Sequence, residues 1–559
     1  MVKNLLNIFN REIAGLHEAA YLLGFFALCS QILALWRDRM LASHFGAGTT
    51  LDLYYSAFRI PDILFVTLAS IVSISVLIPL IIERLDKGKP EAKEFINNVF
   101  SFFFFAIGFS AVLAFIFTPQ LMALIFPNFA VLPTFGELVS LTRVLLLSPI
   151  FLGFSNLLAS ITQVYKRFFV YAMSPVVYNV GIIIGIIFFY PIWGLTGLGF
   201  GVILGAFFHF AIQAPFVASE KMLPSIRFYI KWKDIKNIIF ISLPRTITVS
   251  SVEITKLFMV SFASFFIPGS VSVFNFSLNL QSVPLSIIGV SYSIAAFPTL
   301  SRIFSTGNKQ QFLEQMVSSV RHIVFWSIPV TVLFIVLRAQ IVRTILGAGG
   351  FNWDATRLTA AALALFVVSL IAQNLITLFI RSYYSQGRTK TPLFMNLFSA
   401  IVTIVTTYYL VMLFNSNEFF RSFWESLLKV TDLEGTVVLM LPLGFSIGAL
   451  FNLCIHWFAF EKDFKNFSGL LFKTFFHTFS SSIIMGFVAY KFLDVFDNVF
   501  NVDTLLGIFL QGFLSGVMGI ISAIIVLYLL KNRELMEVWK ALHKKIWKAK
   551  VVVPGSDPQ

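Results

Sequence analysis

The sequence contains little cysteine, little histidine and few charged residues. Its 559 residues include 2 cysteines and 7 histidines, and 12% are charged, against roughly 25% in soluble domains. Cys29 and Cys454 both lie in apolar runs, which excludes a disulfide framework, and the scattered histidines show no metal-ligand spacing. No Walker loop and no G-x-S-x-G elbow occurs, so neither ATP hydrolysis nor a serine hydrolase is indicated. We therefore expect a protein that is not an enzyme and has no bound cofactor.

Long apolar runs take the place of these signatures. Hydrophobic residues make up 58% of the chain, 67 of the residues are Phe, and the mean hydropathy is +0.86. A helix needs about 20 apolar residues to cross the hydrocarbon core. The runs predict an all-α polytopic membrane protein with about fourteen transmembrane helices. The expected spans are 20–45, 52–83, 95–126, 133–164, 168–190, 193–219, 236–266, 271–301, 312–347, 355–385, 391–414, 436–460, 468–494 and 503–530.

Basic residues alternate strongly between the gaps that separate these spans. The even-numbered gaps and the adjoining parts of their spans hold twenty Lys and Arg residues, whereas the odd-numbered gaps and their adjoining parts hold four, namely Arg357, Arg421, Lys429 and Lys491. Cytoplasmic loops carry the excess of basic residues, so both termini are expected on the cytoplasmic side. These loops and the C-terminal tail account for most of the net charge of +14. Anionic membrane lipids, and no nucleic acid, are therefore the expected partners.

Three segments outside the spans have amphipathic spacing. Residues 1–19 predict a short N-terminal lead-in helix, and residues 415–435 predict a helix on the outer membrane surface. Residues 531–559 form a cytoplasmic tail in which Trp539 and Trp547 alternate with lysines. That pattern is typical of a basic helix on the anionic inner leaflet. Ordinary loop packing is the alternative for the second and third segments.

A weak internal echo recurs after six spans. The first span ends in the sequence FGAG at residues 45–48, and the seventh ends in FIPG at residues 266–269. Each is followed by a span that contains an internal proline, Pro61 in one case and Pro284 in the other. An even offset predicts a parallel repeat, which usually places a substrate site between two halves near the midplane.

Eight basic residues are expected at membrane depth, where each charge costs about 3 kcal/mol or more without a partner. They are Arg37, Arg39, Arg59, Arg143, Arg245, Lys256, Arg338 and Arg343. Snorkelling to an interface is the expectation for Arg39, Arg143, Arg338 and Arg343. Acidic companions include Asp38, Asp52, Asp62 and Glu253, and Glu253 is spaced to form a helical pair with Lys256. The remaining net-positive interior of spans 1, 2 and 7 suits an anionic, phosphate-bearing substrate.

Specific motifs extend this interpretation. Residues 35–48 (LWRDRMLASHFGAG), followed by Asp52 and by residues 57–61 (AFRIP), closely resemble the first two spans of the MurJ (MviN) lipid II flippases. These belong to the multidrug/oligosaccharidyl-lipid/polysaccharide exporter superfamily. Residues 381–392 (RSYYSQGRTKTP) resemble the family's loop between spans ten and eleven, and residues 289–301 resemble its span eight.

The resemblance implies two pseudo-symmetric six-helix lobes, at residues 20–220 and 221–462, and two further helices at residues 463–530 that line a lipid-tail groove. It implies a bacterial cytoplasmic-membrane flippase that moves undecaprenyl-diphosphate-linked disaccharide-pentapeptide to the outer leaflet by alternating access. Cell-wall synthesis proteins are implied partners. The family's cavity Arg and adjacent Asp fall on Arg37 and Asp38, and a further sensitive acid falls on Asp52.

The chain also departs from the family pattern. Three cavity arginines of the family fall on Gln31, Phe65 and Asn279, and a cavity Glu falls on Ser70. We predict that Arg37, Arg59, Arg245 and Lys256 bind substrate, with Asp38, Asp52 and Glu253 as gating residues or charge partners. Asp38 and Asp52 are expected to hold arginines or to close the outer gate. The alternatives are export of another lipid-linked oligosaccharide, an ion-coupled drug or metabolite antiporter, and a non-transporting scaffold. Energy would come from the membrane potential or an ion gradient, with Na+ as one option.

Overall fold

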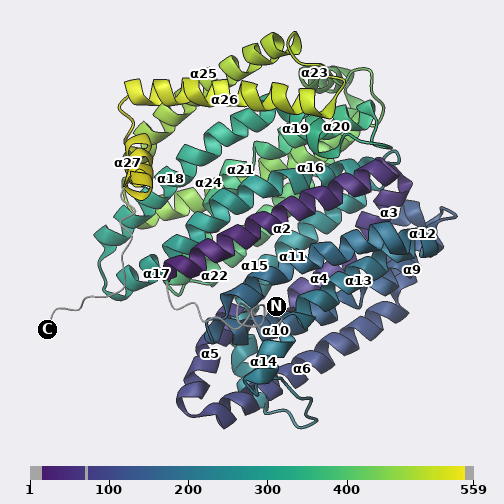
Figure 1. Ribbon diagram of the computed structural model, residues 1–559, viewed down its shortest axis with the longest axis vertical. Coiled ribbons are helices and arrows are strands. Elements are labelled where there is room, and N and C mark those ends of the chain that lie inside the picture. Colours follow the sequence, from purple (N-terminus) through teal and green to yellow (C-terminus); the bar gives the residue numbers. More distant parts are fainter. Residues whose placement is uncertain (1–15, 70–73, 548–559) are drawn as a thin grey trace. The chain divides into compact units, whose positions relative to one another are not determined.

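Helices connected by short turns make up the described chain. The computed structural model describes residues 16–69 and 74–547 (Figure 1). The helices of the first half are α2 (Leu16–Phe45), α3 (Thr49–Ala57), α4 (Arg59–Ala69), α5 (Ile74–Asp86), α6 (Lys89–Ile116), α7 (Thr118–Ile125), α8 (Pro127–Ala130), α9 (Phe135–Leu145), α10 (Ser148–Val164), α11 (Phe168–Ile184), α12 (Tyr190–Trp193), α13 (Leu195–Ala211), α14 (Ala214–Ser219) and α15 (Trp232–Ala263). A π-helical turn, η1 (Gly185–Phe189), joins α11 to α12.

The second half continues in the same way. Its helices are α16 (Ser270–Leu285), α17 (Ser291–Ser305), α18 (Lys309–Val336), α19 (Arg338–Leu346), α20 (Trp353–Val367), α21 (Leu370–Ser385), α22 (Lys390–Ser416), α23 (Glu418–Leu428), α24 (Met440–Asp463), α25 (Phe467–Asp497), α26 (Leu505–Leu529) and α27 (Arg533–Trp547). Two short turns are η2 (Ser286–Val290) and η3 (Thr436–Leu439). No β-strand occurs in residues 16–69 and 74–547, which confirms the predicted all-α class.

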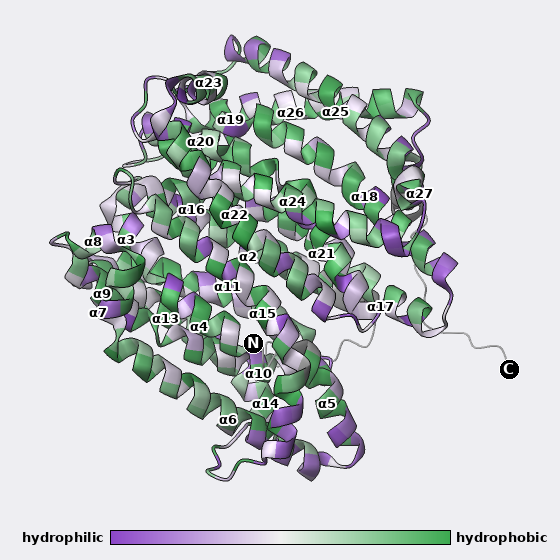
Figure 2. Ribbon diagram, turned by 180° about the vertical axis from the view of Figure 1, so that it is seen from behind, coloured by the Kyte–Doolittle hydropathy of each residue, from purple (hydrophilic) through white to green (hydrophobic). Residues whose placement is uncertain are grey.

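Eleven of the described helical segments are long and apolar enough to cross a membrane. A twelfth arises if α20 and α21, bent by 42° at their junction, form one span. The remaining two expected spans correspond to α2, which carries Arg37, Asp38 and Arg39, and to the interrupted path α3–α4–α5. Figure 2 shows hydrophobic residues along the long helices and hydrophilic residues at many connections. The chain is a multi-pass membrane protein, and the count of fourteen spans and the orientation of the termini stay predictions.

The chain forms two compact units that are discontinuous in sequence. The first comprises Met1–Val283, Ile345–Phe366 and Arg388–Asn452, and the second comprises Pro284–Thr344, Val367–Gly387 and Leu453–Gln559. One apolar core of the first unit packs α5, α6 and α10, with Leu77, Phe103 and Leu158 at its centre. A core of the second unit packs α18, α21, α24 and the start of α25 around Phe379 and Phe460. The lobe boundaries drawn from the sequence stay predictions.

The amphipathic segments have different outcomes. Residues 418–428 are helical as α23, and Phe419 of this helix is 83% exposed. The side chain of Asn417 caps the helix by accepting a hydrogen bond from the Phe420 amide. Residues 533–547 are helical as α27. Most of the predicted lead-in helix over residues 1–19 lies outside the described residues, and residues 16–19 begin α2. How α23 and α27 meet the membrane stays a prediction.

Candidate functional site

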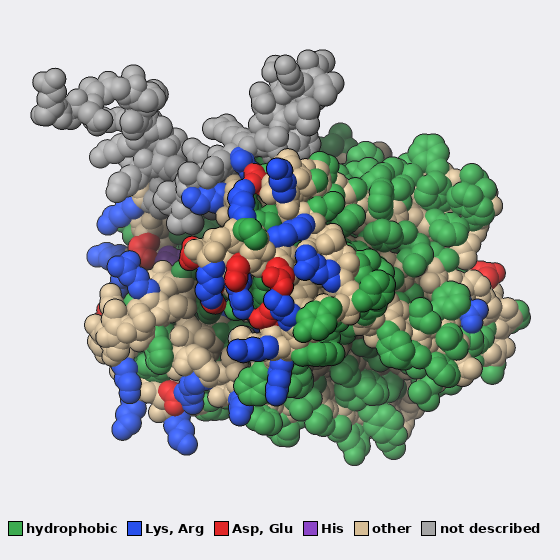
Figure 3. All heavy atoms as spheres, turned by 90° about the horizontal axis from the view of Figure 1, so that it is seen from below, with side chains coloured by type: hydrophobic (Ala, Val, Ile, Leu, Met, Phe, Trp, Pro, Cys, Tyr) green, Lys and Arg blue, Asp and Glu red, His purple; other side chains and the backbone are tan. Residues whose placement is uncertain are grey.

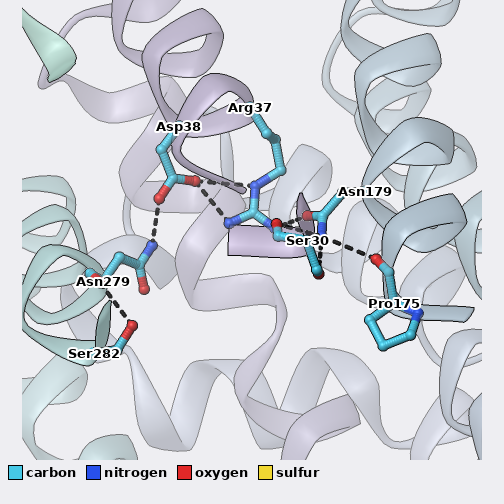
Figure 4. Close-up of polar contacts among 7 residues, drawn as sticks. All are labelled: Ser30, Arg37, Asp38, Pro175, Asn179, Asn279 and Ser282. Carbon is cyan, nitrogen blue, oxygen red and sulfur yellow. Dashed lines mark hydrogen bonds and ion pairs between the residues drawn. The ribbon is translucent and has the colours of Figure 1, made fainter. Parts of the chain in front are cut away.

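Arg37 and Asp38 form the centre of a polar cluster on α2. Two guanidinium nitrogens of Arg37, Nε and Nη2, donate to Oδ1 of Asp38 at 3.0 and 2.7 Å (Figure 4). The Asp38 side chain is 4% exposed, whereas the Arg37 side chain keeps 19% of its surface open. Pairing neutralises both ions, which removes most of the cost of placing them among apolar helices.

An amide from α11 fixes the other edge of the Arg37 guanidinium. Nη1 of Arg37 donates to Oδ1 of Asn179 at 3.0 Å. The Asn179 side chain is itself oriented, because its Nδ2 donates to the hydroxyl of Ser30 at 3.2 Å and to the carbonyl of Pro175 at 3.0 Å (Figure 4). The guanidinium is therefore held in one direction by α2 and α11 together.

Asn279 on α16 holds the carboxylate of Asp38 from the opposite side. Its Nδ2 donates to Oδ2 of Asp38 at 3.0 Å (Figure 4). This is a position where the family resemblance places an arginine. The amide preserves a hydrogen bond to Asp38 but contributes no charge, so the positive charge opposite Asp38 comes from Arg37.

Arg59, at the start of α4, is buried in a second polar contact. Its Nε donates to the carbonyl of Tyr55 at 3.2 Å and its Nη2 to Oδ1 of Asn275 at 3.4 Å. Asp62 lies 3.9 Å from the same guanidinium. Only 9% of Arg59 is exposed. These contacts fit a residue that joins α3, α4 and α16 better than one that is open to a ligand.

Lys256 and Glu253 form the helical pair expected on α15. Nζ of Lys256 lies 2.8 Å from Oε1 of Glu253. Asp62 interacts electrostatically with Glu253 and Lys256, which places the start of α4 near this part of α15. Arg245 lies eight residues before Glu253 in the same helix, about 12 Å along the axis. A substrate-binding role for Arg245 stays a prediction.

This pairing corrects the expected net-positive interior. Arg37 pairs with Asp38, Arg59 with Asp62, and Lys256 with Glu253. Counting charges along the sequence missed this balance because it predicted a specific ion-pair partner only for Glu253. An unpaired charge at membrane depth is costly, so each of these cations has a carboxylate within 4 Å.

Asp52 contacts backbone amides and a hydroxyl instead of an arginine. Oδ2 accepts from the Gly269 amide at 2.7 Å, and Oδ1 accepts from the amide and the hydroxyl of Ser272 at 2.8 and 2.6 Å. The carboxylate thus caps the N-terminus of α16, where unpaired amides and the helix dipole favour a negative charge. The expectation that Asp52 holds an arginine is wrong, and a role at the outer gate stays a prediction.

Three loops meet beside Asp52, and we call residues 43–52, 267–272 and 345–350 the loop seam. The amide of Gly350 donates to the carbonyl of Ser43 at 2.7 Å. Gly269 has φ +95°, and a Cβ there would lie 2.4 Å from the Ala47 carbonyl oxygen. Gly349 has φ +54°, and a Cβ there would lie 2.4 Å from the Ser43 carbonyl oxygen. Glycine is required at both positions by conformation and by space. Residues 45–48 (FGAG) and residues 267–269 (IPG) of the internal echo thus both lie in this seam.

Sequence reasoning missed Asn179, Asn275 and the contact made by Asn279. A polar amide within an otherwise apolar span is a usable signal, because such side chains commonly bond to neighbouring helices. The partner could not be read from spacing, since Asn179 lies 142 residues from Arg37 and Asn279 lies 241 residues from Asp38.

No metal centre is evident in the described part of the chain. Residues 16–69 and 74–547 contain no group of three or more His, Cys, Asp or Glu side chains arranged to hold an ion. Binding of Na+ stays a prediction.

Comparison with known proteins gives a family match over most of the chain. A family model described as "Lipid II flippase MurJ" matches residues 41–511. A curated relative from Rickettsia prowazekii (strain Madrid E), described as "Probable lipid II flippase MurJ", is 29% identical over 389 residues, which cover 69% of this chain and 76% of that protein.

Solved structures show the same fold. A structure described as "Lipid II flippase MurJ, inward closed conformation" aligns with a TM-score of 0.72 at 22% identity, covering 92% of this chain and 100% of that one. An inward-facing multidrug resistance MATE family transporter of the MOP superfamily aligns with a TM-score of 0.63 at 16% identity, covering 79% and 95% of the two chains. The helical arrangement of this chain is therefore shared with both of these transporters.

Proposed function

The chain belongs to the lipid II flippase MurJ family, and from this premise we propose that it carries lipid II from the inner to the outer leaflet of the bacterial cytoplasmic membrane. Lipid II is a disaccharide-pentapeptide on undecaprenyl diphosphate, so its headgroup carries a compact anion. The observation that supports this function best is the oriented, partly open guanidinium of Arg37. Transport, and no covalent chemistry, is the activity that we propose.

Arg37 is suited to contact the diphosphate. A guanidinium has five N–H groups, and the contacts to Asp38 and Asn179 use three of them. The remaining two can donate to adjacent phosphate oxygens, and the planar fork matches that geometry better than an ammonium group does. Asn179 keeps the fork oriented, so little conformational entropy is lost when substrate binds.

Asp38 then acts as an internal competitor for the guanidinium. We propose that the diphosphate takes over donors of Arg37 while Asn279 retains the Asp38 carboxylate through its 3.0 Å hydrogen bond. The site releases substrate when Asp38 again pairs with Arg37. This exchange of Arg37 between Asp38 and the diphosphate does not require a net positive charge in the empty site. The Arg37–Asp38 ion pair of the structure agrees with that.

The loop seam supplies the closed outer gate in this proposal. Asp52 holds Gly269 and Ser272, and the glycine contacts bring the 43–52 and 345–350 segments together. Opening outward would break these hydrogen bonds, and closing would restore them. The membrane potential is the proposed energy source, since one charge that crosses the field is worth about 2.3 kcal/mol per 100 mV. An ion gradient, including Na+, is the alternative.

Complementation tests the function directly. The chain is expressed in a bacterium whose lipid II flippase can be depleted and which lacks a second flippase. We expect growth and normal cell-wall labelling with the wild-type chain. The matched control is Asn156→Ala, which removes an amide of α10 that makes none of the hydrogen bonds described for the polar cluster. A chain that reaches the membrane but leaves cells with inner-leaflet lipid II contradicts the proposal.

A second candidate is export of another lipid-linked oligosaccharide. It is favoured by Gln31, Phe65 and Asn279, which stand where the family resemblance places arginines. Under this alternative the chain fails to complement lipid II flipping, and its deletion removes a surface polysaccharide in the native host.

A further inference from the structure

The segment between α14 and α15, together with the first residue of α15, carries large aromatic side chains that are mostly exposed. Phe228, Tyr229 and Trp232 are 90%, 80% and 64% exposed. The backbone from residue 222 to 231 has no regular secondary structure and bends at Phe228. We call residues 223–232 the aromatic hairpin. Exposed aromatic side chains of this size on a cytoplasmic loop would be unfavourable in water.

Polar side chains of α6 hold the two arms of the hairpin. The Ser225 amide donates to Oδ1 of Asn97 at 2.9 Å, and the Arg227 amide donates to the Ser101 hydroxyl at 2.7 Å. Asn98 exchanges two hydrogen bonds with the backbone of residue 231, at 2.8 and 3.1 Å. Asn97, Asn98 and Ser101 are each at most 4% exposed.

These contacts would allow the segment to enter the membrane. Irregular backbone is tolerated in the hydrocarbon region only where protein groups satisfy its polar atoms. Asn97, Asn98 and Ser101 satisfy the amides of the descending and returning arms, and Nζ of Lys93 donates to the carbonyl of Leu223 at the entrance. Asn97, Asn98 and Ser101 thus form a buried polar face of α6 because they bind the backbone of the aromatic hairpin.

The tip of the hairpin lies against the apolar surface of α6. The ring of Phe228 is 5.9 Å from that of Phe105, and Trp232 is 6.1 Å from Phe102. Phe105 lies eleven residues beyond Glu94, the last charged residue of α6, or about 16 Å along the helix axis. Beyond Phe105 the helix exposes further apolar side chains, including Phe109 at 67%. The tip is therefore continuous with a lipid-facing surface.

Basic residues surround the same segment. Residues 221–236 contain five Lys or Arg and one acid, Asp234. The exposed ones include Arg227 and Lys233. In the view of Figure 3, Lys and Arg side chains gather on one part of the protein surface, and hydrophobic side chains cover much of the rest. An apolar tip flanked by cations is the pattern of a segment that enters an anionic leaflet.

We infer that the aromatic hairpin inserts Phe228 and Tyr229 into the inner leaflet and binds anionic phospholipid headgroups through Arg227 and Lys233. This surface is separate from the Arg37 cluster and does not depend on which lipid-linked cargo the chain moves. Its occupant is the bilayer itself, because the tip continues the lipid-facing side of α6 and the flanking charge is complementary to anionic headgroups.

Spin-label accessibility tests the insertion. The full chain with Cys29→Ser and Cys454→Ser is labelled at Phe228→Cys in nanodiscs of phosphatidylcholine and phosphatidylglycerol at a ratio of about 3:1. We expect the label to collide with oxygen more than with a water-soluble nickel chelate. The control Lys87→Cys, on an exposed residue of the α5–α6 connection, should show the reverse. If the nickel chelate reaches residue 228 as readily as residue 87, the inference is overturned. Shielding of residue 228 from both oxygen and the nickel chelate would also overturn it, because that result indicates contact with protein.

Lipid retention tests the headgroup contact. Phosphatidylglycerol bound to the purified chain is quantified by native mass spectrometry for Arg227→Gln, Lys233→Gln and the double variant. We expect about fivefold weaker binding for each charge removed. The control Arg421→Gln removes an exposed charge from α23 and should leave this binding unchanged. Equal losses in the control, or no loss in the double variant, contradict the anionic-lipid contact.

Discussion

The side-chain amide of Asn279 donates to Asp38 at 3.0 Å, across 241 residues of sequence. Asp38 accepts on its other oxygen from Arg37. One carboxylate therefore lies between a neutral donor and a charged one. This arrangement leaves Arg37 as the cation that balances Asp38, and it determines how readily Arg37 can turn to an anionic substrate.

Replacing Asn279 with arginine should strengthen substrate binding. The new guanidinium can pair with Asp38 and so release Arg37 for the diphosphate. We expect about tenfold tighter binding of undecaprenyl diphosphate to the purified protein, the effect of one additional charge-assisted hydrogen bond. Asn279→Gln retains a neutral amide and serves as the control. Equal affinities for the Arg and Gln variants would show that Asp38 does not compete for Arg37.

Gly349→Ala should open the loop seam. The added Cβ would lie 2.4 Å from the Ser43 carbonyl oxygen, which is backbone and cannot rotate away. The readout is the rate at which Ser270→Cys, in a background without Cys29 and Cys454, reacts with a maleimide that cannot cross the membrane. Ser270 is 1% exposed, so labelling should accelerate roughly tenfold or more.

The control for this variant is Gly307→Ala. Gly307 also has a positive φ, +73°, but a Cβ there would meet no atom within 4 Å. The Gly307→Ala variant therefore has the conformational cost of an alanine with positive φ, but its new Cβ does not clash with the loop seam. Similar acceleration in both variants would mean that general destabilisation, and not opening of the seam, exposes residue 270.

Glu253 and Lys256 should behave as one electrostatic unit. Lys256→Ala leaves the Glu253 carboxylate without its 2.8 Å partner, and Glu253→Ala leaves the ammonium group unpaired. Each single variant should lower the thermal stability in detergent more than the double variant does, because the double variant leaves neither charge behind. Additive losses would favour the earlier expectation that Lys256 acts as an independent substrate-binding cation.

Acidification should weaken the docking of α27 against α18 and α25. Burial opposes ionisation of Glu534, but backbone hydrogen bonds and the contacts from Arg321 and Thr474 outweigh it and lower the pKa of Glu534 below its ordinary 4.5. A lowered pKa gives stabilisation that is complete above pH 4.5 and is lost as pH falls through the folded-state pKa. Hydrogen exchange of residues 533–547, corrected for the intrinsic pH effect, should increase only below that range. Glu534→Gln should exchange faster at neutral pH and lose this pH dependence, and unchanged protection in that variant would contradict the docking role.

Local patterns predicted more than long-range contacts did. The apolar runs predicted the helices, and a spacing of three residues predicted the Glu253–Lys256 pair, because both depend on helix periodicity alone. The acceptor role of Asp52 and the amide from Asn179 depend on how distant helices pack, which spacing does not contain. The prediction of a net-positive interior was wrong for the same reason. The sequence shows the carboxylates, but it does not show which cation each carboxylate contacts.

The most direct test measures lipid II on the outer surface of cells that depend on this chain. An externally added enzyme that cleaves lipid II and cannot cross the membrane reports the transported pool. Arg37→Ala should abolish cleavage while the protein remains in the membrane, and Arg37→Lys should restore it only in part because lysine lacks the bidentate fork. Cleavage at the wild-type level with Arg37→Ala would contradict the account of Arg37 as the diphosphate ligand.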